Sequence, residues 1–247
     1  MIVEWLPAFR FVGHRGGRGP GWPVENTLAA FDEARRRGAV AIEFDVRTSR
    51  DGEPMVIHDP TVSRVAGIGR HVHDLSRREL EALRLADGSS RVPALEEVVA
   101  WANSHGVALN CELKHDVPSR VGLAHAAATC LEACRVPLLV SSFDPVSLAL
   151  FARQAPRVPR ALLTELRQGL AGELFRRVAR PPLVDVLHPE YADVDESFLA
   201  RAKGAGLRVG AWTVNVPARA RALLSMGVDY VITDDVGLMG ERAEAGG

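Results

Sequence analysis

The sequence has few cysteines, almost no net charge and no long apolar run, and each of these absences excludes a class of protein. Its three cysteines show neither a CxxC nor a Cys/His zinc spacing, so buried free thiols in a reducing compartment are expected. The formal net charge of −1 gives no sign of nucleic-acid binding or of attachment to a membrane surface. No stretch approaches the roughly 18 apolar residues of a transmembrane helix, so no stable membrane insertion is expected.

Several signature motifs are also missing. The N-terminus has no basic segment followed by an apolar core, so no signal peptide is predicted and the cytoplasm is the expected compartment. The glycines between residues 16 and 21 fit neither a G-x-G-x-x-G nor a P-loop register. A G-x-S-x-G elbow does not occur either. A dinucleotide-binding protein, a P-loop protein and a serine-nucleophile hydrolase are therefore disfavoured.

Short apolar runs alternate with amphipathic stretches from one end of the chain to the other. The runs predict strands over residues 9–13, 41–45, 108–112, 138–141, 160–163, 184–187, 207–211 and 229–232. Apolar residues at three- and four-residue intervals predict helices over 27–37, 95–105, 122–134, 146–154, 196–203 and 218–226. Eight strands alternating with helices favour an α/β TIM (β/α)8 barrel over a doubly wound sheet, because eight is the barrel number.

The alternation breaks once, after the second predicted strand. The segment 46–93 holds a short apolar run and a polar, glycine-bearing stretch instead of a single helix. It predicts a small insertion, with a hairpin of its own, in a single barrel domain that spans residues 1–247.

Three carboxylates stand near the ends of neighbouring predicted strands, where the active sites of barrels lie. Glu43 and Asp45 are two residues apart, so on a strand both side chains point to one face. Glu112 ends the next barrel strand at a corresponding height. If these carboxylates face the barrel interior, they repel one another unless a cation lies between them. The alternative is that Glu43 faces outward and forms a salt bridge with a helix arginine. The trio predicts an all-oxygen site for one divalent cation, Mg²⁺ or Ca²⁺.

Two histidines and two basic residues are placed near the same strand ends. His14 ends the first predicted strand beside Arg15, and His58 follows a short apolar run after the second. A histidine with an ordinary pKa near 6.5 exchanges a proton at neutral pH, so both are candidate proton carriers. The Arg15 guanidinium suits phosphate oxygens, and Lys114, two residues beyond Glu112, adds a second positive charge. Together they predict a site for a charged phosphoryl group.

These residues belong to a series of short motifs. The series is His14-Arg15-Gly16, Glu25-Asn26-Thr27, Glu43-x-Asp45, His58-Asp59, Glu112-x-Lys114, Ser142-Phe143, His188-Pro189 and Trp212-Thr213-Val214-Asn215. In order and spacing it resembles the glycerophosphodiester phosphodiesterase family over about residues 11–234. Taken by itself, the segment 25–27 is interpreted as a cap that opens the first helix. The glycine-rich loop at 16–23 is longer than the family pattern, which would reshape the mouth of the substrate site.

The resemblance implies a TIM barrel with an insertion after the second strand, and the hydrolysis of glycerophosphodiesters to glycerol 3-phosphate and an alcohol. It also implies a role for each motif residue. The implied metal ligands are Glu43, Asp45 and Glu112; the implied general acid and base are His14 and His58; the implied substrate-binding residues are Arg15, Lys114, His188 and Trp212.

Two other functions remain open at this point. One is a phospholipase on the same barrel, of the lysophospholipase D or phospholipase C type, and the other is a non-catalytic phosphodiester-binding protein. The expected partner is a small-molecule glycerophosphodiester and not a nucleic acid. The released alcohol, the choice between Mg²⁺ and Ca²⁺, and the oligomeric state are left open by the sequence.

Overall fold

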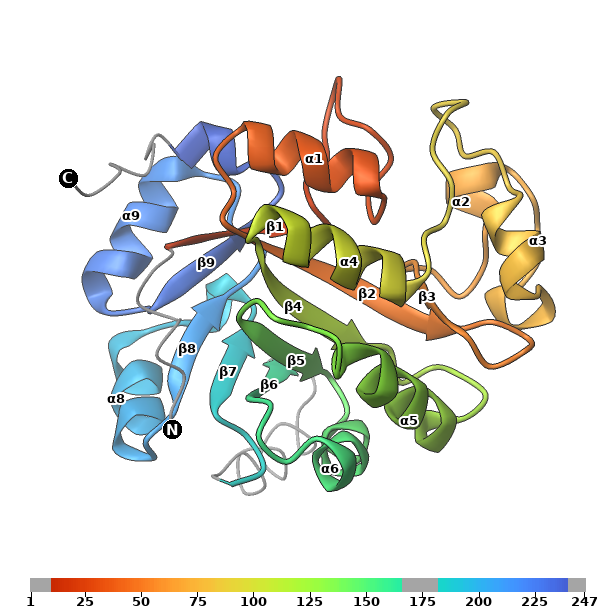
Figure 1. Cartoon of the computed structure of the whole chain (residues 1–247). Coiled ribbons are helices and arrows are strands. Elements are labelled where there is room, and N and C mark those ends of the chain that lie inside the picture. Colours follow the sequence, from red (N-terminus) through yellow and green to blue (C-terminus); the bar gives the residue numbers. More distant parts are fainter. Residues whose placement is uncertain (1–9, 166–181, 240–247) are drawn as a thin grey trace.

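The computed structural model describes residues 10–165 and 182–239, and within these ranges eight parallel strands close into a barrel (Figure 1). Closure is complete because the first strand pairs with both the second and the last. The TIM barrel predicted from the strand count is therefore confirmed, although residue 9 of the first predicted strand lies outside the described residues. The strands are β1 (Phe11–His14), β2 (Ala41–Thr48), β4 (Ala108–Leu113), β5 (Leu138–Ser142), β6 (Arg160–Thr164), β7 (Val186–Pro189), β8 (Arg208–Ala211) and β9 (Tyr230–Thr233).

Helices surround the barrel and return the chain to the next strand (Figure 1). Polar caps start several of them: Thr27, for example, accepts a hydrogen bond from the Ala30 amide, and Asp144 accepts one from Ser147. In the described ranges no helix is both long and apolar enough to cross a bilayer. These covering helices are α1 (Leu28–Arg36), α4 (Leu95–His105), α5 (Arg120–Leu131), α6 (Pro145–Gln154), α8 (Glu196–Gly204) and α9 (Pro217–Met226).

The chain between β2 and α4 leaves the barrel pattern, and β2 is longer than predicted. The predicted strand ended at residue 45, but β2 continues to Thr48 because β3 (Pro54–Val56) pairs antiparallel with its end. The first residues of the expected insertion, given as about 46–93, therefore still belong to β2. The segment goes on through α2 (Ser63–Ala66), the 3-10 helix η2 (Val72–Asp74) and α3 (Arg77–Glu81), around a small core that includes Met55, Ile57, Val62 and Leu80.

Side chains on the strands alternate between two environments, as the period of two requires. Outward residues such as Phe44, Leu109 and Cys111 pack against the helices in the main core. Inward apolar residues, mostly nearer the start of each strand, form a second cluster inside the barrel: Val12, Ala41, Ala108, Leu139, Ala161, Val186, Tyr230 and Ile232. The polar inward positions lie further along the same strands, so they gather at the carboxyl end of the barrel.

None of the three cysteines lies among the polar side chains at the carboxyl end of the barrel. All three are free thiols, as expected. Only Cys111 is buried, however. Cys130 lies at the end of α5 and Cys134 just beyond it, and both are half-exposed.

Candidate active site

A cavity of about 150 Å³ opens at the carboxyl end of the barrel. Seven of the nine predicted site residues line it, and the other two, Asp45 and His188, are buried behind its wall. The lining consists of His14, Arg15, Glu43, His58, Asn110, Glu112, Lys114, Phe143, Leu163, Glu165, Trp212 and Ile232.

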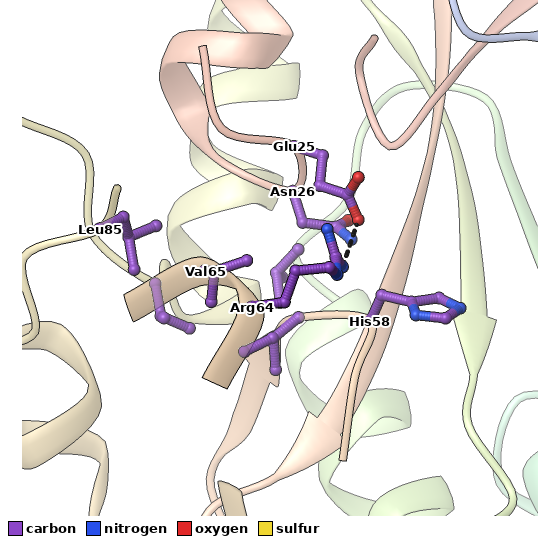
Figure 2. A pocket seen from close by; sticks show the side chains of 9 residues that line it. Glu25, Asn26, His58, Arg64, Val65 and Leu85 are labelled. Atoms are coloured by element: carbon purple, nitrogen blue, oxygen red, sulfur yellow. Dashed lines mark hydrogen bonds and ion pairs between the residues drawn. The ribbon is translucent and has the colours of Figure 1, made fainter. Parts of the chain in front are cut away.

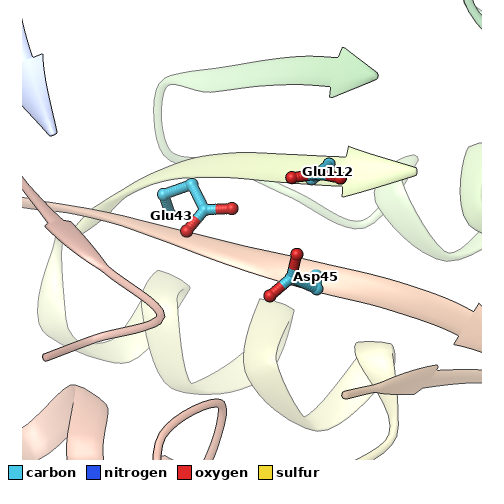
Figure 3. Close-up of side chains that lie close together, drawn as sticks. All are labelled: Glu43, Asp45 and Glu112. Atoms are coloured by element: carbon cyan, nitrogen blue, oxygen red, sulfur yellow. The ribbon is translucent and has the colours of Figure 1, made fainter. Parts of the chain in front are cut away.

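Three acidic side chains converge from the neighbouring strands β2 and β4 (Figure 3). Asp45 and Glu112 are direct partners in the parallel register, and Glu43 lies two residues before Asp45 on the same face. One oxygen from each carboxylate lies within 4.8 Å of the others, and all three residues are buried. Oxygens bound to one Mg²⁺ or Ca²⁺ at 2.0–2.6 Å lie no more than about 4–5 Å apart, so this trio fits a single ion.

The pKa values of the trio also indicate that these carboxylates are stabilised by a nearby positive charge. Burial, followed by repulsion from Asp45 and Glu112, raises the pKa of Glu43 well above its ordinary value. Burial and the charge of Asp45 raise the pKa of Glu112 to about 7. Three carboxylates forced together in this way are stabilised when a divalent cation shares their charge. The residues present therefore fit a divalent ion.

Two cationic side chains contact the same acidic groups. The Lys114 ammonium lies 2.7 Å from Glu112 and 3.4 Å from Asp45, and Arg15 Nε lies 3.3 Å from Asp45. Burial alone would raise the pKa of Asp45, but Lys114 and Arg15 lower it below its ordinary value. The Arg15 Nε is buried and, despite this ion pair, no acceptor meets it with hydrogen-bond geometry.

The backbone after β1 is bent sharply to bring Arg15 into the cavity. Arg15 has a φ of 55°, an uncommon conformation for a residue with a side chain. Its amide donates to Glu43 at 3.0 Å and its carbonyl accepts from the Asn26 amide, which fixes the turn on both sides. Gly13 is required here because a Cβ at this position would lie 2.3 Å from the Gly16 carbonyl oxygen.

His14 is held by a carboxylate that the sequence analysis did not single out. Its Nδ1 lies 2.7 Å from Asp234 Oδ1, which leaves Nε2 directed toward Glu43 at 4.0 Å. Asp234 is fixed in turn by Arg18 Nε at 2.9 Å and by Asn215 Nδ2 at 2.7 Å. Burial lowers the pKa of His14, and the hydrogen bond that His14 donates to Asp234 partly opposes that shift. Asp234 directly follows β9, so its strand-end position was the signal that could have identified it.

His58 is oriented in the same manner by the insertion. The Ile57 amide donates to the Asp45 carbonyl at 2.9 Å, which brings the following residue, His58, to the acidic trio. Its Nδ1 lies 2.7 Å from Asp59 Oδ1, and Arg64 Nε donates to the other oxygen of Asp59 at 2.6 Å. Burial lowers the pKa of His58, while the charge of Asp45 opposes the shift. Both histidines therefore direct Nε2, and not Nδ1, to the cavity.

Glu25 connects the two halves of the site. It accepts a hydrogen bond from Arg64 at 2.8 Å (Figure 2). It also accepts one from Arg15 at 2.7 Å and lies 3.6 Å from Arg18. One carboxylate thus contacts Arg15, which lines the cavity, and the arginine behind each histidine–aspartate pair.

The interpretation of residues 25–27 as a helix cap is consequently right only for Thr27. Asn26, which has a φ of 59°, donates from Nδ2 to Asp45 at 2.9 Å and accepts from the Asp45 amide at 3.2 Å. The segment therefore orients the residues that face the metal position as well as starting α1.

The structure places His188, one of the predicted substrate-binding residues, outside the cavity lining. Its side chain is 0% exposed and does not line the cavity; Nε2 lies 2.5 Å from the Tyr230 hydroxyl inside the barrel. Side chains alternate along β7, so His188 points to the barrel axis like Val186 two residues earlier, and it lies inside the barrel beside Tyr230. Its carbonyl instead accepts a hydrogen bond from Trp212 Nε1 at 2.7 Å. Trp212 does line the cavity, where it meets Phe143 edge to face at 5.5 Å.

The fold and the site together define a class, the TIM-barrel hydrolases of phosphoric diesters. Residues 14–238 match the model of the glycerophosphoryl diester phosphodiesterase family, and the chain belongs to that family.

Proteins and solved structures of several bacteria are similar over almost the whole chain. The uncharacterized protein YqiK of Bacillus subtilis is 31% identical over 235 residues, which cover 91% of this chain and 94% of that protein. A glycerophosphodiester phosphodiesterase of Caldanaerobacter subterraneus is 29% identical, with 85% and 88% covered. The structure of a phosphodiesterase from Oleispira antarctica, in complex with the product sn-glycerol-3-phosphate, matches with a TM-score of 0.83 at 25% identity, and the match covers 94% of this chain and 95% of that one.

Proposed function

We propose that this protein hydrolyses glycerophosphodiesters to glycerol 3-phosphate and an alcohol, with the help of one divalent cation. The observation that carries the proposal is the convergence of the acidic trio, two oriented histidines and two phosphate-binding cations on one cavity of about 150 Å³. The product complex of the Oleispira antarctica phosphodiesterase supports the same substrate class.

Glu43, Asp45 and Glu112 would hold the cation, as all three are buried carboxylates that face one point. A bound Mg²⁺ or Ca²⁺ supplies Lewis-acid stabilisation of the charge that grows on the phosphate oxygens. Arg15 and Lys114 bind the same phosphate from the β1 and β4 sides of the cavity. The cavity therefore orients the phosphorus between the two histidines.

The histidines transfer the protons. One imidazole takes the proton from the attacking hydroxyl, which by analogy with the family is the glycerol 2-hydroxyl, and the other protonates the departing alcohol. A cyclic phosphate forms in this step, and water opens it with the two proton transfers reversed. Asp234 and Asp59 keep each Nδ1 hydrogen-bonded, so that each Nε2 is free for the exchange.

Turnover of glycerophosphocholine in the presence of Mg²⁺ or Ca²⁺ tests the proposal directly. We expect EDTA to abolish activity and either ion to restore it. His14→Ala and His58→Ala should each lower kcat by about 10²–10⁴-fold. His125→Ala is the matched control, because His125 lies on α5 and hydrogen-bonds Gln154 away from the cavity. Near-normal turnover in both His14→Ala and His58→Ala would contradict the assignment.

Product analysis separates this function from the two alternatives. A phospholipase would release product faster from lysophosphatidylcholine than from glycerophosphocholine. A binding protein would bind glycerophosphocholine saturably and release no glycerol 3-phosphate with any divalent ion. We expect glycerol 3-phosphate from the deacylated substrate as the dominant product.

A further inference from the structure

The cavity has two chemically different walls. In the closed ring of strands, β6 lies four strands from β1 in both directions, so residues after β6 face those after β1 across the barrel axis. The acidic trio, His14, Arg15 and Lys114 come from β1, β2 and β4. The opposite wall is formed by Phe143 after β5, Glu165 after β6 and Trp212 after β8.

Glu165 is the unusual member of that wall. Glu43 and Glu112, the other carboxylates of the lining, both have partners: Glu43 accepts from the Arg15 backbone amide and lies 4.0 Å from His14 Nε2, and Glu112 accepts from the Lys114 ammonium. Glu165 is half-buried, and no hydrogen bond or ion pair joins its carboxylate to another residue in the part of the chain that the structure describes. A negative charge that faces a substrate cavity without a counter-charge attracts a cation from solution or from the substrate.

Two fixed aromatic rings accompany this carboxylate. Trp212 Nε1 donates to the His188 carbonyl at 2.7 Å, which holds the indole in one orientation. Phe143 meets the indole at 90° with a centroid distance of 5.5 Å. Both rings line the same cavity as Glu165, and aromatic rings together with a carboxylate form the kind of surface that binds ammonium groups, quaternary ammonium groups in particular, through cation–π attraction.

The two walls therefore suit the two parts of a zwitterionic diester. The phosphate, with its negative charge, belongs at the wall of Arg15 and Lys114, two cationic residues that line the cavity. We propose that Glu165, Phe143 and Trp212 form a subsite for the positively charged head group of the leaving alcohol, an amino alcohol with a primary or quaternary ammonium. This inference rests on the proposed function, because it assigns the alcohol side of the same cavity.

Other head groups fit that wall less well. A neutral polyol such as glycerol would donate hydrogen bonds to Glu165 but would gain no cation–π attraction from the rings. An anionic head group would be repelled by the carboxylate. The structure thus favours glycerophosphocholine and glycerophosphoethanolamine over glycerophosphoglycerol.

The test compares kcat/KM for glycerophosphocholine and glycerophosphoglycerol in wild type and in Glu165→Gln. Cation–π and partly exposed ionic contacts contribute about 0.5–2 kcal/mol, so wild type should favour the choline substrate by about 3- to 30-fold. Glu165→Gln should lower kcat/KM for glycerophosphocholine by about 2- to 5-fold and change the value for glycerophosphoglycerol less than about 1.5-fold. The preference of wild type should also shrink as the salt concentration rises.

Two further variants make the comparison specific. Glu190→Gln is the matched control, because Glu190 is a half-buried carboxylate directly after β7 that does not line the cavity; it should leave the ratio unchanged. Trp212→Leu keeps an apolar wall but removes the ring, and it should reduce the preference for choline. An unchanged melting temperature shows that each variant is folded.

Several results would overturn the inference. An equal ratio in wild type and Glu165→Gln would do so, as would a wild type that prefers glycerophosphoglycerol. If no diester is hydrolysed with any divalent ion, the proposed function fails, and the subsite is then decided by binding. In that case calorimetric titration with glycerophosphocholine should show tighter binding than glycerophosphoglycerol in wild type and not in Glu165→Gln; equal binding in both proteins would reject the subsite.

Discussion

Replacing Asp234 with asparagine tests whether the carboxylate behind His14 sets the state of the imidazole. Both Asp234 oxygens accept hydrogen bonds: Oδ1 from Arg18 and His14, and Oδ2 from Asn215. An asparagine has one acceptor oxygen, so its amide group must face either Arg18 and His14 or the Asn215 amide. In the first arrangement, Nδ1 of His14 must become the acceptor, and Nε2 then carries the proton in the neutral ring.

The magnitude follows from the loss of one charge-assisted hydrogen bond of 2.7 Å. Such bonds contribute about 1.5–3 kcal/mol, which corresponds to a decrease in kcat/KM of about 10- to 100-fold. Burial lowers the pKa of His14 and Asp234 opposes this, so the pKa should fall further in the variant. The limb of the pH–rate profile that belongs to His14 should therefore move to lower pH.

The assay is the pH dependence of kcat/KM for glycerophosphocholine hydrolysis, measured with saturating divalent ion. Asp235→Asn is the matched control, because Asp235 is the next residue and pairs with Arg37 outside the cavity. It should leave both the rate and the profile unchanged. A loss of less than about twofold in Asp234→Asn, or a pH profile identical to that of wild type, would refute the assigned positioning role.

Three other predictions concern the metal position and the barrel interior. Asn26→Ala removes both hydrogen bonds to Asp45 and should weaken Mg²⁺ binding by about 10- to 100-fold in calorimetric titrations; unchanged affinity would show that Asp45 needs no such support. Because the pKa of Glu112 is raised to about 7, metal binding must displace a proton as the pH falls below 7, and the affinity should then drop by about tenfold per pH unit. A pH-independent affinity between pH 6 and 8 would contradict this. Tyr230→Phe leaves Nε2 of the fully buried His188 without its partner and should lower the free energy of unfolding by about 1–3 kcal/mol in urea titrations, whereas an unchanged value would mean that this contact is not stabilising.

The strand and helix pattern was largely predictable because it depends on local periodicity. The apolar runs at 108–112 and 160–163 became β4 and β6, each extended by one residue, since buried parallel strands read as continuous apolar segments. The end of β2 was not predictable in this way. Its last residues are extended because β3 pairs with them, and that pairing partner is supplied by the insertion.

The candidate site was predictable to the extent that its residues stand at strand ends. Glu43, Asp45 and Glu112 followed from strand alternation and from the parallel order of β2 and β4. That His188 lies outside the cavity lining was not predictable, because the sequence does not say at which height along the barrel axis a side chain lies. Asp234 was overlooked because it is 220 residues away from His14, and only barrel closure brings β9 beside β1.

The sequence by itself determined the barrel, the acidic trio and the identity of the two histidines, because these depend on periodicity and on spacing within short segments. Tertiary structure alone decided which nitrogen of each histidine faces the cavity, which arginines Glu25 holds together, and which wall carries the unpaired Glu165. These properties arise from contacts between the first, middle and last parts of the chain, and closure of the ring sets their distances.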